Sequence, residues 1–80
     1  MDIKVLGTGC SRCKILEKAT IQAVKELELN VEVEKIEDIQ KIMEYGILSM
    51  PGLVINGKIA LTGQVPKIEE LKTIIKRYKD

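Results

Sequence analysis

The two cysteines of the chain are the residues best suited to chemistry, and they lie close together. Cys10 and Cys13 are separated by two residues in the segment GTGCSRC, residues 7–13. Two thiols at this spacing can cycle between a dithiol and a disulfide, bind a soft metal ion, or form a small structural crosslink. Which of these applies depends on the elements that position the two sulfur atoms.

Metal binding and a structural disulfide can be weighed from the sequence. A zinc site needs about four ligands, and the chain has no histidine and no third cysteine. Two thiolates could still bind Cu(I) or another soft ion. A disulfide closing so short a loop would remove only about 2 kcal/mol of unfolded-state entropy. We therefore favour a redox pair with no metal and no cofactor beyond a Cys10–Cys13 disulfide, with a Cu(I)-type carrier and a structural pair as alternatives.

The composition favours one small globular domain over residues 1–80. The 80 residues include 13 basic and 12 acidic side chains, and 45% of them are hydrophobic, which is unlike the composition of disordered segments. There is no Trp or Phe, so aliphatic residues must form the core. Near-neutral charge and few aromatic residues give no basis for nucleic-acid binding. We expect a monomer.

The expected location is the cytoplasm, without membrane contact. No apolar run approaches the length of a membrane span, and the N-terminus lacks the pattern of a signal peptide. In that reducing compartment, an isolated pair of cysteines is more often catalytic or metal-binding than a permanent disulfide.

Apolar periodicity predicts the element order β-α-β-α-β-β-α. Strands separated by a helix should be parallel, whereas a closing hairpin is antiparallel. The expected fold is therefore α/β, with a four-stranded mixed sheet flanked by helices on both faces. Strands are predicted at residues 3–6, 30–36, 53–55 and 58–61, and helices at residues 10–27, at 38–45, and from Pro66 onward.

The second predicted helix has recognisable ends. Asp38 can cap its N-terminus, and Gly46 stands where a left-handed closing residue is expected. Its inner side is predicted to consist of Ile39, Ile42 and Met43.

The strongest local signal is LVINGKIAL, residues 53–61. Asn56 and Gly57 tolerate the positive φ angles of a type I′ turn, which predicts a hairpin. Residues 31–34 alternate Val and Glu, which indicates a strand near a sheet edge.

The first helix is expected to begin at or just after Cys10, with Cys13 one turn further along. Unpaired N–H groups and the helix dipole would then favour a thiolate at Cys10, which makes it the candidate nucleophile. Cys13 is deeper and nearer the predicted apolar stripe of the helix, and it would resolve the mixed disulfide. That stripe consists of Leu16, Ala19, Thr20, Ala23, Val24 and Leu27. The first turn carries Ser11, Arg12 and Lys14 but no acid. This favours an anion at that end, with ordinary solvated charge as the alternative.

CSRC (residues 10–13) before the first helix and SMPG (residues 49–52) before the hairpin together resemble the thioredoxin superfamily. The match covers nearly the whole chain and is closest to the glutaredoxin-sized archaeal and bacterial thioredoxin-like proteins called redox-active disulfide proteins. The resemblance implies a thiol-disulfide oxidoreductase that acts on protein disulfides and is supplied with electrons by an upstream reductase. A redox-sensing interaction domain remains an alternative. A ferredoxin-like metal carrier would instead run β-α-β-β-α-β.

The resemblance also implies a set of substrate-binding residues. Pro51 matches the family's cis proline, which implies a cis Met50-Pro51 bond and an exposed Met50 backbone that can pair with an extended substrate chain. Gly63 matches the glycine after the last strand and would line the same groove. Ser11 and Arg12, between the cysteines, complete the expected set.

Two segments depart from the larger members of the superfamily. The first strand has Lys4 where larger thioredoxins carry a buried acid. GQVPK, residues 63–67, differs from the glutathione-binding segment of glutaredoxins, so the resemblance does not extend to glutathione.

Overall fold

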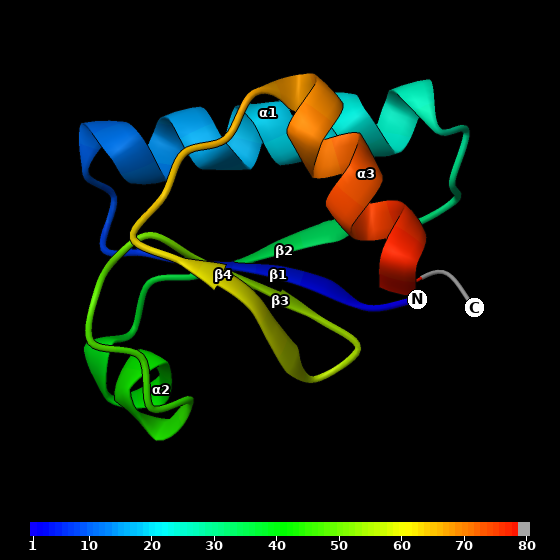
Figure 1. The fold of residues 1–80 in the computed structure, drawn as a ribbon. Coiled ribbons are helices and arrows are strands. Elements are labelled where there is room, and N and C mark those ends of the chain that lie inside the picture. The colour runs from blue at the N-terminus through cyan, green and yellow to red at the C-terminus, as the bar shows by residue number, and fades with distance from the viewer. Residues whose placement is uncertain (79–80) are drawn as a thin grey trace.

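The seven predicted elements form in the predicted order. The computed structural model describes residues 1–78 (Figure 1). Its elements are β1 (Ile3–Leu6), α1 (Ser11–Glu26), β2 (Val33–Ile36), α2 (Ile39–Glu44), β3 (Gly52–Ile55), β4 (Lys58–Thr62) and α3 (Ile68–Tyr78).

The four strands form one mixed sheet in the order β2-β1-β3-β4. β1 pairs in parallel with β2 and antiparallel with β3, and β3 pairs antiparallel with β4. This confirms the predicted sheet and the edge position of the second strand. β2 begins only at Val33 because Val33 is the partner of Ile3, the first residue of β1.

Helices cover both faces of the sheet, as predicted. Figure 1 shows α1 and α3 together over one face and α2 over the other. Under α1 and α3 lies the larger core cluster, which consists of Ile3, Val5, Leu16, Ala23, Val24, Leu53, Ile55, Leu71 and Ile75. Under α2 lies a smaller cluster of Leu6, Ile42 and Val54.

α1 buries the stripe that the periodicity predicted. Leu16, Thr20, Ala23 and Val24 are buried, and Ala19 and Leu27 are half-buried and pack against the core. The Thr20 hydroxyl donates a hydrogen bond of 2.7 Å to the Leu16 carbonyl, so its oxygen is not left without a partner in the core. α1 is therefore fixed on the sheet along most of its length.

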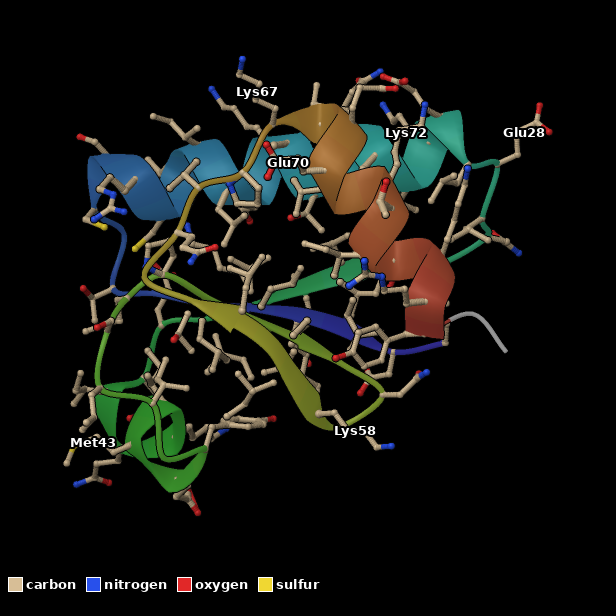
Figure 2. All side chains as sticks on the ribbon, in the orientation of Figure 1. Glu28, Met43, Lys58, Lys67, Glu70 and Lys72 are labelled. Atoms are coloured by element: carbon tan, nitrogen blue, oxygen red, sulfur yellow. The ribbon has the colours of Figure 1, made fainter. Side chains whose placement is uncertain are left out.

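The prediction for the inner side of α2 is wrong at two positions. Ile42 is buried, but Ile39 and Met43 are 46% and 67% exposed, and Figure 2 shows Met43 on the outer side of α2. The helix has only six residues, and the sheet contributes just Leu6, Val54 and the half-buried Ile36 to the cluster beneath it. The contact between α2 and the sheet is therefore small and buries a single residue of the helix, Ile42.

The predicted ends of α2 are confirmed. The Asp38 carboxylate accepts a hydrogen bond of 2.9 Å from the Gln40 N–H, as an N-cap does. Gly46 has a φ of 77°, which is the left-handed conformation expected after a helix.

The third helix begins later than predicted. α3 starts at Ile68, not at Pro66, and the Lys67 carbonyl accepts a hydrogen bond of 3.0 Å from the Leu71 N–H. Lys67 is therefore the residue before the helix. Residues 64–67 have no regular structure because they carry the chain from the sheet up to the helical layer (Figure 1).

The hairpin turn has the predicted conformation. Asn56 and Gly57 have φ angles of 54° and 77°, as a type I′ turn requires. The Asn56 side chain accepts a hydrogen bond from the Asp2 N–H at 3.0 Å and donates one to the Tyr78 carbonyl at 3.0 Å. The turn is thereby joined to the start of β1 and the end of α3.

Candidate active site

Cys10 is the N-cap of α1. Its backbone is extended, with φ −70° and ψ 167°, and its Sγ accepts a hydrogen bond of 3.3 Å from the Cys13 N–H. The thiol is free and exposed to solvent. The predicted start of the first helix is therefore confirmed, and the sulfur lies where α1 presents unpaired N–H groups.

The surroundings of Cys10 favour its thiolate. A hydrogen bond with the Cys13 side chain, followed by hydrogen bonds from the backbone N–H groups of Cys13 and Arg12, lowers the pKa of Cys10. These groups stabilise the charged form of the sulfur. The direction agrees with the prediction from the helix N-terminus.

Cys13 is in the opposite situation. It is a free thiol with a relative exposure of 1%. Burial, followed by the hydrogen bond with Cys10, raises the pKa of Cys13. The two sulfur atoms therefore differ in both access and acidity, and Cys10 loses its proton first.

Gly7 makes room for the Cys13 side chain and was not recognised as a site residue from the sequence. A Cβ on Gly7 would overlap the Cys13 Sγ and would lie 2.7 Å from the Cys13 Cβ, closer than carbon atoms approach. The sequence showed only a glycine in a turn after a strand. The one available signal was the position of Gly7 three residues before Cys10. This position indicates a contact with Cys13 only when α1 is known to pack over the end of β1.

The Met50-Pro51 peptide bond is cis, as the resemblance implied. Pro51 is buried, whereas Met50 is 36% exposed. Because Leu6 pairs with Gly52 across β1 and β3, the residues after Leu6 and those before Gly52 emerge at the same end of the sheet. We name residues 49–51 the cis-proline segment.

Gly63 lies directly against the cis-proline segment. Its N–H donates a hydrogen bond of 2.7 Å to the Pro51 carbonyl. Its φ is 69°, and a Cβ there would lie 2.9 Å from the Cβ of Ser49. A glycine is required at this position both by the left-handed backbone and by the close approach.

Arg12 is also connected to this region. Its Nη2 donates a hydrogen bond of 2.7 Å to the Gly63 carbonyl. Ser11, the first residue of α1, is exposed, and its side chain makes no hydrogen bond within residues 1–78. The structure thus brings Cys10, Arg12 and Gly63 to one end of the sheet and leaves Ser11 at the surface.

Lys4 is engaged by carboxylates. Its Nζ lies 3.6 Å from an Asp2 oxygen and 3.9 Å from a Glu34 oxygen. Asp2, followed by Tyr45, raises the pKa of Lys4. Lys4 is thus a half-buried cation in an ion-pair cluster, unlike the acid that larger thioredoxins carry at this place.

Two findings bear on metal and membrane binding. Within residues 1–78, no three or more His, Cys, Asp or Glu side chains are grouped so that they could hold a metal ion. In the same part of the chain, no helix has the length and apolar character needed to span a membrane.

Comparisons with known proteins agree with this geometry. A family profile described as a thioredoxin domain matches residues 1–76. A thioredoxin of Methanothermobacter thermautotrophicus is 43% identical over 94% of this chain and 97% of its own length. A thioredoxin of Methanocaldococcus jannaschii is 33% identical over 95% of this chain and 87% of its own.

A solved structure described as that of a malarial protein superposes with a TM-score of 0.67 at 15% identity, covering 100% of both chains. At that identity the similarity shows the fold alone. The matched profile, together with the Cys10 and Cys13 pair at the start of α1, identifies the chain as a member of the thioredoxin family and a thiol-disulfide oxidoreductase.

Proposed function

We propose that Cys10 is the nucleophile and Cys13 the resolving thiol of a dithiol-disulfide couple that reduces protein disulfides. The observation that carries this assignment is the contrast between the two sulfur atoms. Cys10 is exposed with a lowered pKa, and Cys13 is buried with a raised pKa. Because the thiolate is the attacking species, the exposed and more acidic thiol attacks first.

The reaction consists of two exchanges. The Cys10 thiolate attacks one sulfur of the substrate disulfide, a Cys10–substrate disulfide forms, and the other substrate sulfur leaves as a thiolate. Cys13 then loses its proton and attacks the Cys10 Sγ, which releases the second substrate thiolate and leaves a Cys10–Cys13 disulfide. Two electrons pass to the substrate, whose thiolates take up two protons.

The cis-proline segment is proposed to bind the substrate chain. Met50 is exposed, and within residues 1–78 its backbone makes no hydrogen bond, so its polar groups are free to pair with an extended peptide. Gly63 supports this segment through the hydrogen bond that its N–H donates to the Pro51 carbonyl. Ser11 and Arg12, which follow the nucleophile in the first turn of α1, complete the proposed set.

An open site suits a protein substrate. Two surface depressions, of about 560 and 900 Å³, are lined by other residues, and Cys10, which lines neither of them, is exposed to solvent. A disulfide carried on another protein can reach such a sulfur without entering a pocket. We further propose that an upstream dithiol reductase returns the oxidised couple to the dithiol, that no other cofactor takes part, and that the protein acts as a cytoplasmic monomer.

Trapping of the mixed disulfide tests the assignment. A Cys13→Ser variant should accumulate disulfides between Cys10 and a protein substrate such as insulin, visible by non-reducing electrophoresis and lost on adding a thiol. The matched Cys10→Ser variant should trap nothing. If only Cys10→Ser formed adducts, the two roles would be reversed.

A Cu(I) carrier is the competing function, because two thiolates suffice for that ion. It would be supported by stoichiometric Cu(I) binding in a protein whose wild-type form reduces no disulfide. Reversible oxidation of the Cys10–Cys13 pair in a thiol buffer would instead favour the redox function. A reduction potential of about −270 mV would indicate a reductase, and one of about −120 mV an oxidant.

A further inference from the structure

Gly63 makes two hydrogen bonds that join different parts of the active site. Its N–H donates to the Pro51 carbonyl at 2.7 Å, and its carbonyl accepts from Arg12 Nη2 at 2.7 Å. Pro51 belongs to the cis-proline segment, and Arg12 lies two residues after Cys10 on α1. A continuous path therefore runs from the helix of the nucleophile through Gly63 to the segment proposed to bind substrate.

The chain passes from β1 to α1 through a short glycine-rich turn. The turn between β1 and α1 contains Gly7, Thr8 and Gly9, and Gly9 has a φ of 86°. Glycine-rich turns have more conformational freedom than other connections. The Arg12 guanidinium supplies a contact between α1 and the opposite side of the site that the turn does not.

We propose that Arg12 is a positioning residue, which holds Gly63 and, through it, the cis-proline segment at a fixed place relative to Cys10. This inference rests on the proposed function of that segment. Arg12 touches neither the substrate nor the reacting sulfur atoms in this role. Its effect is on how well an extended chain fits between Met50 and Cys10, because small displacements from the reactive geometry reduce the rate of attack.

The role differs from tuning of the thiolate by charge. The pKa of Cys10 is lowered by the Cys13 side chain and by backbone N–H groups, including that of Arg12. Replacing the Arg12 side chain leaves those backbone groups in place. A positioning role therefore predicts altered binding of long substrates with an unaltered Cys10 pKa.

The chain offers a matched control. Lys14 is exposed in the same part of α1, and its side chain makes no hydrogen bond or ion pair within residues 1–78, although its backbone N–H donates to the Cys10 carbonyl at 3.0 Å. Arg12→Gln and Lys14→Gln each remove one positive charge near Cys10, but only Arg12→Gln breaks the contact with Gly63. Arg12→Lys keeps the charge and hydrogen-bond donors but replaces the planar guanidinium with an ammonium group.

The experiment measures the reduction of two substrates, insulin and cystine, and the hydrogen exchange of the Gly63 amide. For Arg12→Gln, KM for insulin should rise about fivefold, the loss expected for a charge-assisted hydrogen bond at the surface. The rate with cystine, a small disulfide that needs only Cys10, should stay within about twofold of wild type. The pH at which Cys10 alkylation reaches half of its maximal rate should be the same as in wild type. The Gly63 amide should exchange with solvent faster by about the same fivefold factor, because its bond to Pro51 is less constrained.

Lys14→Gln should change none of these quantities, and Arg12→Lys should restore part of the loss in KM. Equal effects of Arg12→Gln and Lys14→Gln on insulin would overturn the proposal, as would an unchanged Gly63 exchange rate. A shifted Cys10 pH profile would assign Arg12 to charge tuning instead. If the wild type reduced neither substrate, the proposed function would fail, while Gly63 exchange would still decide whether Arg12 holds this residue.

Discussion

The Cys13 side chain packs against the Cα of Gly7, in the space that a Cβ would occupy. The last turn before α1 thereby provides the cavity for the buried sulfur. Because the Cys13 side chain forms a hydrogen bond with Cys10 and is the proposed resolving thiol, the shape of this cavity bears on both stability and the second exchange.

Gly7→Ala should displace Cys13 and lower the free energy of unfolding by about 1 to 3 kcal/mol, the usual cost of overpacking a core. It should also prolong the lifetime of the mixed disulfide, because the resolving sulfur no longer lies in its native place. Urea unfolding and quenched-flow analysis of the adduct would measure the two effects. Thr8→Ala, at an exposed position in the same turn, is the control, and equal behaviour of both variants would show that Gly7 has no such role.

The opposite pKa shifts of the two cysteines predict two-step alkylation of the reduced protein. Cys10 should react with its half-maximal rate at a lower pH than a cysteine of the urea-unfolded chain, and Cys13 at a higher pH. Cys13→Ser should move the Cys10 profile upward, because the Cys13 side chain is the first cause of the lowered pKa. Mass spectrometry of iodoacetamide-treated protein identifies each site. A Cys10 profile identical in the folded and unfolded chain would contradict the prediction.

The same shifts determine how stability depends on pH. Because the folded pKa of Cys10 lies below its unfolded value, its ionisation stabilises the reduced fold above the unfolded pKa, and this contribution is lost as pH falls through the folded pKa. Cys13 has the opposite sign: its contribution is complete below the unfolded pKa and is lost as pH rises through the folded pKa. Reduced Cys10→Ser should therefore lose more stability with rising pH than reduced wild type, as measured by urea unfolding at several pH values, and equal slopes would contradict this.

Features that depend on neighbours in the sequence were predictable. The left-handed turn at Asn56 and the start of α1 at Cys10 follow from a few adjacent residues. The cis bond before Pro51 came instead from family resemblance. The contact between Arg12 and Gly63 joins residues 51 positions apart, so no local pattern could reveal it.

The exposed side of α2 was not predictable for a different reason. Six residues make fewer than two turns, too few for the spacing of Ile39, Ile42 and Met43 to specify which of them faces the sheet. The positions of Leu6, Val54 and the half-buried Ile36 on that face of the sheet decide it.

Substitutions in α2 should distinguish its two sides. Ile42→Ala should lower the free energy of unfolding by about 2 to 4 kcal/mol, because it leaves a cavity beside Leu6 and Val54. Met43→Ala, at a side chain that is 67% exposed, should change it by less than about 0.5 kcal/mol. Urea denaturation measures both. A large loss for Met43→Ala would mean that Met43 is buried in solution.

The side chain and backbone of Asn56 make separable contributions to stability. Its φ of 54° is unfavourable for most residues, and its amide joins Asp2 to Tyr78 through two hydrogen bonds of 3.0 Å. Asn56→Gly keeps the favourable backbone but loses both side-chain bonds, so we expect a loss of about 1 to 2 kcal/mol. Asn56→Ala loses the bonds and also places a Cβ in the left-handed region, which adds about 1 kcal/mol. Urea unfolding should therefore rank wild type above Asn56→Gly and Asn56→Ala lowest, with insulin reduction unchanged because the turn lies at the opposite end of β3 from Pro51. Equal stability of the two variants would show that the left-handed backbone carries no cost here.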